Sequence, residues 1–252
     1  MSKKILITSI GRTATSSINA LLAQFSGVIS HHEKAKNDPY FLFLSQFDAY
    51  QKFTQDYLKD RDDQANRSGA KIYVEVNPYF RFVDHEFLRS KGWSTLFIVR
   101  HPKTYLESVY RRKLFMPNDS SFQKLPDSSD PFYEQWPTCS RFEKLCWYYS
   151  QVHEFVLNEN HPFFRYESLV GEGQDLPRLL NEVGIKDFDV NTIKLPHLNK
   201  SGIHSKSQIL QTALSRSNKI PDELQWEVLT EAERKTYDSV CRPLLTKLGY
   251  ED

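Results

Sequence analysis

The first eighteen residues constrain the fold more than any other stretch of this chain. An apolar run, Ile5-Leu6-Ile7, leads to Gly11-Arg12, and small hydroxylated residues follow. Apolar side chains then recur at helical spacing, at Ile18, Leu21, Leu22 and Phe25. A strand, a tight turn and a helix N-terminus together favour anion binding, because unpaired backbone N–H groups and the positive end of the helix dipole meet there. The turn therefore predicts a site for a phosphate-like group.

The rest of the chain alternates between strands and helices. Strands are predicted at 71–76, 94–99 and 163–166, and helices at 39–63, 79–91, 102–112, 142–157, 169–183 and 222–248. Residues 114–135 are rich in Pro, Ser and Asp and predict a long loop. Such alternation is typical of a mostly parallel sheet with helices on both faces. We therefore expect one α/β domain, residues 1–252, with three layers and a mostly parallel central sheet.

Composition excludes several classes of protein. The formal net charge is only +1, which argues against a nucleic-acid-binding protein. No apolar run approaches the roughly 18 residues that span a bilayer, and the first apolar stretch is too short for a secretory signal. Cys139, Cys146 and Cys241 lack the spacing of a metal site. We expect a cytoplasmic protein with reduced thiols, no metal, no nucleic acid and no membrane contact.

A second motif restricts the class of ligand that the sequence predicts. The strand at 94–99 stops at Arg100-His101-Pro102, and Ser108 follows Arg100 by eight residues, inside the next predicted helix. The sequence lacks G-x-x-x-x-G-K-[ST], which disfavours an ordinary ATP- or GTP-hydrolysing enzyme. Together, the two motifs resemble those of the sulfotransferases that use 3′-phosphoadenosine 5′-phosphosulfate (PAPS) and release 3′-phosphoadenosine 5′-phosphate (PAP). The motif spacing is most similar to protein-tyrosine, heparan and bacterial sulfotransferases.

This resemblance implies a P-loop-NTPase-like sulfotransferase fold and assigns a role to each matching residue. The first turn resembles the 5′-phosphosulfate loop, formed here by Gly11, Arg12, Thr13, Ala14, Thr15, Ser16 and Ser17. Arg100 and Ser108 match the pair that binds the ribose 3′-phosphate. Tyr166 matches a tyrosine beside the adenine, and the stretch Lys200, Ser201 and Gly202 resembles a loop that closes over the 3′-phosphate. Arg12 would then lie beside the oxygen that bridges to the leaving nucleotide, as the catalytic cation.

One residue departs from the family's pattern. The family commonly has glycine where this chain has Ala14. A Cβ atom makes positive φ costly, so the turn must either stay in the right-handed region or carry strain.

The acceptor must lose a proton, so the resemblance also implies a general base. Glu33 follows Arg12 by 21 residues, which is about the spacing in protein-tyrosine and some heparan sulfotransferases. His32 and His31 adjoin it, and either is an alternative base or orients Glu33. Cytosolic members instead use a His shortly before a Pro. The corresponding stretch here, ending at Pro78, has no His, which makes Glu75 the fallback.

The sequence thus predicts a sulfotransferase that moves a sulfuryl group from PAPS to a hydroxyl or amine, with a small-molecule acceptor. Acceptor contacts are expected from residues 31–70 and 113–140, where aromatic side chains suit a partly apolar compound. Two alternatives remain open. One is a small-molecule or nucleotide kinase on a related fold, and the other is a non-catalytic nucleotide-binding module.

Overall fold

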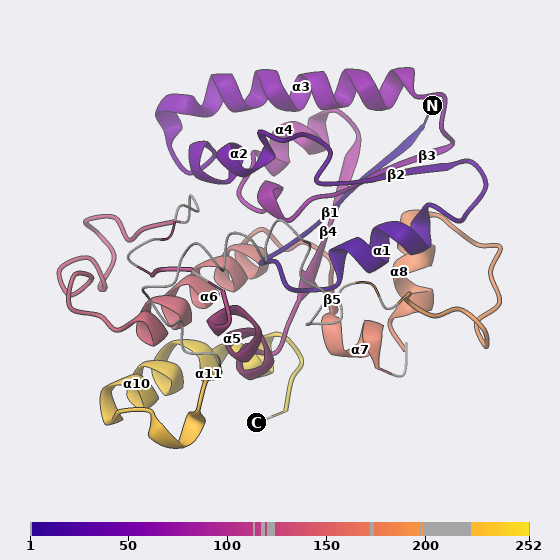
Figure 1. Ribbon diagram of the computed structural model, residues 1–252. Helices are drawn as coiled ribbons and strands as arrows, with labels where there is room; N and C mark the ends of the chain where they lie inside the picture. The colour runs from indigo at the N-terminus through magenta and orange to yellow at the C-terminus, as the bar shows by residue number, and fades with distance from the viewer. Residues whose placement is uncertain are drawn as a thin grey trace, which may run out of the picture.

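The computed structural model describes residues 2–112, 114–116, 119, 124–171, 174–196, 198 and 223–251. A five-stranded sheet lies at the centre, with helices on both sides (Figure 1). Its strands are β1 (Lys3–Ser9), β2 (Val28–His32), β3 (Ile72–Val76), β4 (Trp93–Val99) and β5 (Phe163–Arg165). They lie in the order β2-β3-β1-β4-β5, and every pairing is parallel. The expected three-layer α/β architecture with a parallel central sheet is confirmed.

Because all five strands are parallel, their carboxyl ends lie along one edge of the sheet. β1 is central and pairs with β3 on one side and β4 on the other, with Ile7 opposite Val76 and Ser9 opposite Ile98. His32, at the end of β2, lies opposite Val76. The loops that follow these strands therefore meet at a single edge, where ligands of open α/β sheets generally bind.

Strand alternation divides the core into two faces. On one face, side chains such as Ile5, Ile7 and Phe164 pack against three helices, α1 (Thr15–Leu22), α7 (Tyr166–Val170) and α8 (Leu176–Val183). On the other face, Leu6 and Tyr73 lie in a core with α2 (Asp38–Leu44), α3 (Gln51–Arg67) and α4 (His85–Ser90). Phe97 and Val99 face α5 (Pro102–Tyr110) and α6 (Arg141–Asn158).

Three predicted helices are wrong in extent, because each is interrupted. The prediction for 39–63 becomes α2 and α3, separated by a 3-10 turn at Asp48–Tyr50. The prediction for 79–91 becomes a 3-10 turn at Pro78–Phe80 and α4, which Asp84 caps by accepting a hydrogen bond from the N–H of Phe87. The prediction for 169–183 becomes α7 and α8, and α8 ends at Gly184 with φ of 102°. Side-chain caps and turns overrode the apolar periodicity in these segments.

The C-terminal part packs against α6. It contains a 3-10 turn (Trp226–Val228), α10 (Glu231–Thr236), a π-helical turn (Tyr237–Cys241) and α11 (Arg242–Lys247). The three cysteines are free thiols. Within the described ranges, no helix is both long enough and apolar enough to cross a bilayer.

Candidate functional site

The turn between β1 and α1 has an unusual backbone. Gly11, Arg12 and Ala14 all have positive φ, at 91°, 60° and 56°. The hydroxyl of Ser9 supports this shape, because it accepts hydrogen bonds from Gly11 N at 3.0 Å and from the Thr13 hydroxyl at 2.7 Å. A turn with successive left-handed residues before a helix directs backbone N–H groups into one concavity, which suits an anion.

Ala14 has positive φ, which is the strained of the two conformations considered from the sequence. It occupies the N-cap position of α1 in the left-handed conformation, which costs a residue with a Cβ on the order of 1–2 kcal/mol. Its side chain offers no oxygen to cap the first turn of the helix. Because a capping side chain normally satisfies one of the first N–H groups, its absence leaves the helix N-terminus suited to an external anion.

Arg100 and Ser108 lie against this turn. Nη1 of Arg100 donates a hydrogen bond to the backbone oxygen of Arg12 at 2.5 Å, and Nε of Arg12 donates to the Ser108 hydroxyl at 3.1 Å. These contacts join residues that are 88 and 96 positions apart in the sequence. The two motifs therefore form one surface, where the carboxyl ends of β1 and β4 meet.

Positive charge accumulates on this surface. Burial lowers the pKa of Arg12, and the neighbouring charges of Arg112 and Arg100 lower it further. None of these three arginines forms an ion pair with a carboxylate in the part of the chain that the structure describes. Like charges held together without counter-charges favour a polyanionic ligand.

Tyr166 lies beside the second phosphate motif. The Arg100 guanidinium carbon is 4.4 Å from the centre of the Tyr166 ring. Next to it, the Glu167 carboxylate accepts hydrogen bonds from the N–H of His101, the hydroxyl of Thr104 and the hydroxyl of Tyr250. A cavity of about 530 Å³ opens between α5 and α7, and His101, Lys103, Thr104 and Glu167 are among the residues that line it.

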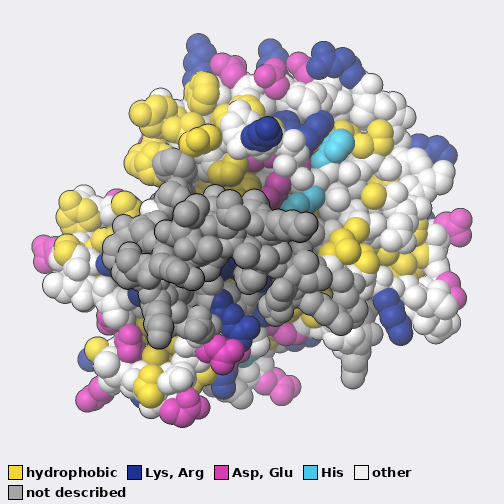
Figure 2. Space-filling model, viewed as in Figure 1, with side chains coloured by type: hydrophobic (Ala, Val, Ile, Leu, Met, Phe, Trp, Pro, Cys, Tyr) yellow, Lys and Arg dark blue, Asp and Glu magenta, His cyan; other side chains and the backbone are white. Residues whose placement is uncertain are grey.

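His32 and Glu33 lie on the other side of the turn. Nε2 of His32 is 3.0 Å from the hydroxyl of Thr15 and 3.5 Å from that of Ser16, both in the first turn of α1. Oε1 of Glu33 is 3.6 Å from the same ring nitrogen, and Glu33 has φ of 45°. Figure 2 shows histidine and acidic side chains close together on this face of the molecule. Two of the sequence-predicted candidate bases therefore lie at the anion site.

His31 points to the opposite face of the sheet. Its ring centre is 5.4 Å from that of Tyr73, in the layer of α2 and α3. Burial lowers the pKa of His31, and the charges of Lys34 and Arg61 lower it further. Successive residues of a strand face opposite sides, so the structure separates His31 from His32.

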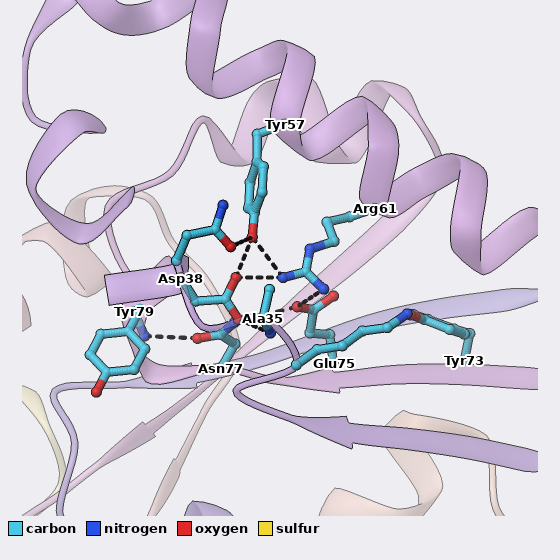
Figure 3. Close-up of polar contacts among 10 residues, drawn as sticks. Ala35, Asp38, Tyr57, Arg61, Tyr73, Glu75, Asn77 and Tyr79 are labelled. Atoms are coloured by element: carbon cyan, nitrogen blue, oxygen red, sulfur yellow. Dashed lines mark hydrogen bonds and ion pairs between the residues drawn. The ribbon is translucent and has the colours of Figure 1, made fainter. Parts of the chain in front are cut away.

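Glu75, the fallback base, belongs to a buried polar network (Figure 3). Its side chain is 1% exposed, and burial raises the pKa of its carboxyl while Arg61, 3.5 Å away, opposes the rise. Asp38 pairs with Arg61 and accepts hydrogen bonds from Asn77 Nδ2 at 2.9 Å and from the N–H of Ala35 at 3.0 Å. The network anchors the segment after Glu33 to β3 and α3.

Lys200, Ser201 and Gly202 lie outside the described residues. Sequence reasoning missed the support that Ser9 gives to the first turn and the electrostatic effect of Arg112 on Arg12. It also missed Arg81, a buried arginine in the turn after β3. Among the described residues, no group of three or more His, Cys, Asp or Glu side chains could hold a metal ion.

No protein-family model matches the sequence. No curated protein matches it. Several solved structures are similar to the chain, and two of them are sulfotransferases. A sulfotransferase domain from the curacin biosynthetic pathway is 16% identical, with a TM-score of 0.48, over 100% of this chain and 99% of that one. Mouse sulfotransferase SULT7A1, complexed with PAP, is 13% identical, with a TM-score of 0.43, over 94% of this chain and 82% of that one.

Proposed function

We propose that this protein is a sulfotransferase that moves a sulfuryl group from PAPS to a hydroxyl or amine of a small acceptor molecule. One observation carries the proposal. Arg100 bonds to the backbone of Arg12, and Arg12 bonds to Ser108, so two anion-binding motifs share one surface. A nucleotide with phosphate groups at both its 3′ and 5′ positions presents two anions at once.

The residues of the first turn would hold the 5′ end of the nucleotide. Backbone N–H groups of residues 13–17 and the hydroxyls of Thr15 and Ser16 would donate to the 5′-phosphate. Arg12 would stabilise the charge that develops on the oxygen bridging phosphorus and sulfur as that bond breaks. Removing one such donor typically costs on the order of 3 kcal/mol in the transition state.

Arg100 and Ser108 would bind the 3′-phosphate, and Tyr166 would lie beside the adenine. The cation–π contact between Arg100 and Tyr166 holds the guanidinium in place. Thr104, which contacts Arg100 Nε at 3.1 Å, helps to orient it. The unpaired charge of Arg100 is then available for phosphate.

Glu33 or His32 would accept the acceptor's proton. Both side chains are partly exposed, and both lie at the N-terminus of α1, where the reacting sulfur would be. His31 faces away from this point and is better suited to packing against Tyr73. Glu75 is held inside the buried network and is poorly placed to reach an acceptor.

The acceptor would be a partly apolar small molecule, and the reaction would take place in the cytoplasm. Exposed aromatic side chains at Tyr40, Phe47, Tyr50 and Phe53 lie in the predicted acceptor region. Apolar side chains gather over α2 at the upper left of Figure 2.

Nucleotide binding provides the first test. In isothermal titration, we expect 3′,5′-ADP to bind and 5′-AMP to bind at least tenfold more weakly, because the second lacks the 3′-phosphate. Equal affinities would end the proposal. A preference for ATP with Mg²⁺ would instead identify a kinase.

Transfer provides the second test. Single-turnover reactions with labelled PAPS and a panel of phenols, sugars and amines should yield a labelled acceptor. Binding of 3′,5′-ADP without transfer to any of them would favour the non-catalytic nucleotide-binding module.

A further inference from the structure

Arg81 lies in the turn that follows β3, at the edge of the sheet where the strands end. It comes directly after the 3-10 turn Pro78–Phe80, and the N–H of Asn77 anchors that turn by donating to Ile7 of β1 at 2.9 Å. Only 4% of Arg81 is exposed. A guanidinium group is therefore buried at the same edge of the sheet as the candidate active site.

Among the described residues, the hydrogen-bond partners of Arg81 are neutral. Nε donates to the backbone oxygen of Pro78 at 2.7 Å, and Nη1 donates to the Tyr148 hydroxyl. In the described ranges, no carboxylate forms an ion pair with it. Arg61, which is 3% exposed, shows the contrast, because it pairs with both Asp38 and Glu75. An unpaired buried charge is expensive, so a site that retains one is suited to a charged ligand.

The charge of Arg81 acts on two neighbouring tyrosines. Burial raises the pKa of the Tyr79 hydroxyl, the Glu33 carboxylate adds to the rise, and Arg81 opposes it. Burial also raises the pKa of the Tyr105 hydroxyl, and three guanidinium groups oppose that rise, those of Arg81, Arg100 and Arg12. These effects agree with the backbone geometry, in which Asn77, four residues before Arg81, is hydrogen-bonded to Ile7 of the central strand β1.

Aromatic contacts place Arg81 on the acceptor side. Its guanidinium carbon is 5.8 Å from the centre of the Tyr148 ring. The Tyr148 ring centre is in turn 5.8 Å from that of Phe115, in the region 113–140 where acceptor contacts are expected. Arg100 and Ser108, which would bind the nucleotide, contact Arg12 in the turn before α1 instead.

We propose that Arg81 binds an anionic group of the acceptor, so that the preferred substrates are small aromatic compounds that carry a carboxylate or a similar anion besides the reacting hydroxyl. The inference rests on the proposed function and specifies its acceptor. The guanidinium supplies the charge and a donor, and the rings of Tyr148 and Phe115 supply an apolar wall.

Binding of 4-hydroxyphenylacetate and of its neutral methyl ester tests the proposal directly. In isothermal titration with 3′,5′-ADP present, the wild-type protein should bind the acid about 10- to 100-fold more tightly than the ester, as expected for a hydrogen bond to a charged group. Arg81→Met should abolish this preference. Arg89→Met removes an exposed arginine from α4 and should preserve the preference.

Two further variants separate binding from structure. Arg81→Lys keeps the charge and should retain part of the preference. Tyr148→Phe removes the neutral partner of Arg81 and should keep most of it, whereas a purely structural role would make this variant resemble Arg81→Met. Equal binding of acid and ester by the wild type would overturn the proposal, even if Arg81→Met failed to fold. A folded Arg81→Met protein that retains the preference would overturn it too.

The transfer reaction gives a second readout. The ratio of kcat/KM for the acid over the ester should fall in Arg81→Met, while the affinity for 3′,5′-ADP stays within twofold. An equal loss of transfer to both compounds would assign Arg81 to the reacting group rather than to the acceptor's anion. If 3′,5′-ADP does not bind at all, the sulfotransferase proposal fails. The binding comparison without nucleotide then still decides whether Arg81 recognises an anion.

Discussion

Nη1 of Arg100 lies 2.5 Å from the backbone oxygen of Arg12, so the side chain of one anion motif supports the backbone of the other. Arg12 has positive φ, and its carbonyl is directed by that conformation toward β4. Arg100 therefore supports the turn, and under the proposed function it would also supply a positive charge to the nucleotide. Variants at this position report on both roles.

Arg100→Ala should weaken the binding of 3′,5′-ADP by about 10- to 100-fold, because it removes a charge-assisted hydrogen bond. Isothermal titration measures the change. Arg89→Ala, at an exposed position of α4, is the matched control and should bind like the wild type. Unchanged affinity in Arg100→Ala would remove this residue from the nucleotide site.

Glu33→Gln should lower turnover by about 100- to 10,000-fold if Glu33 is the base, and His32→Asn should do so if His32 is. Glu33→Gln should retain 3′,5′-ADP binding, because Glu33 is not among the groups assigned to the nucleotide. His32→Asn should weaken it modestly, because Nε2 of His32 contacts the hydroxyls of Thr15 and Ser16. His31→Asn should stay within a few-fold of the wild-type rate, because His31 packs against Tyr73. Single-turnover transfer from PAPS measures the rate of each of the three variants. If both Glu33→Gln and His32→Asn reacted at the full rate, neither residue would be the base.

Ala14→Gly should stabilise the protein by about 0.5–1 kcal/mol. Glycine avoids the cost of about 1–2 kcal/mol that positive φ imposes on alanine in the folded state. Glycine also makes the unfolded chain more flexible, which lowers the free energy of unfolding by about 0.4–1 kcal/mol. Ala23→Gly is the control, because Ala23 is right-handed with φ of −66° and should lose about 0.5–1 kcal/mol. Urea unfolding measures both, and a loss of stability in Ala14→Gly would contradict the left-handed turn.

Stability should fall as the pH is lowered from about 6.5 to about 4. Burial lowers the pKa of His153 to about 4, and that of His85 also to about 4. In this window the unfolded state binds protons that the folded state does not, so each histidine contributes a slope of up to about 1.4 kcal/mol per pH unit. His153→Gln should reduce the proton uptake on unfolding at pH 5 by close to one. An unchanged uptake would mean that His153 titrates normally in the folded protein.

Much of the fold could be predicted from the sequence, because the buried strands are short apolar runs that stop at recognisable turns. The strand ends at Ser9 and Val99 follow from that pattern. The interrupted helices could not be predicted in the same way. Apolar side chains continue at helical spacing through Phe47 and Phe53. The 3-10 turn that separates α2 from α3 does not change this spacing, so the hydrophobic pattern gives no sign of the break.

The candidate site was predictable only where a motif is continuous in sequence. The opposite orientations of His31 and His32 follow from strand alternation, but only once 28–32 is recognised as a strand. Arg112 and Arg81 carried no sequence signal, because their place at the site depends on packing between distant elements. Glu75 lies buried for a similar reason, since its partner Arg61 comes from α3.

The pairing of β1 with both β3 and β4 also sets the order in which the protein can be built. Lys3 pairs with Ile72, and Lys4 with Trp93, so β1 stays unpaired until the chain has been synthesised beyond Ile72. Parallel pairings of this range close long loops and form slowly. A fragment that ends before β4 would retain the first turn but lack its brace at Arg100. Both halves of the site are therefore present only in a fragment that extends from Gly11 to at least Ser108.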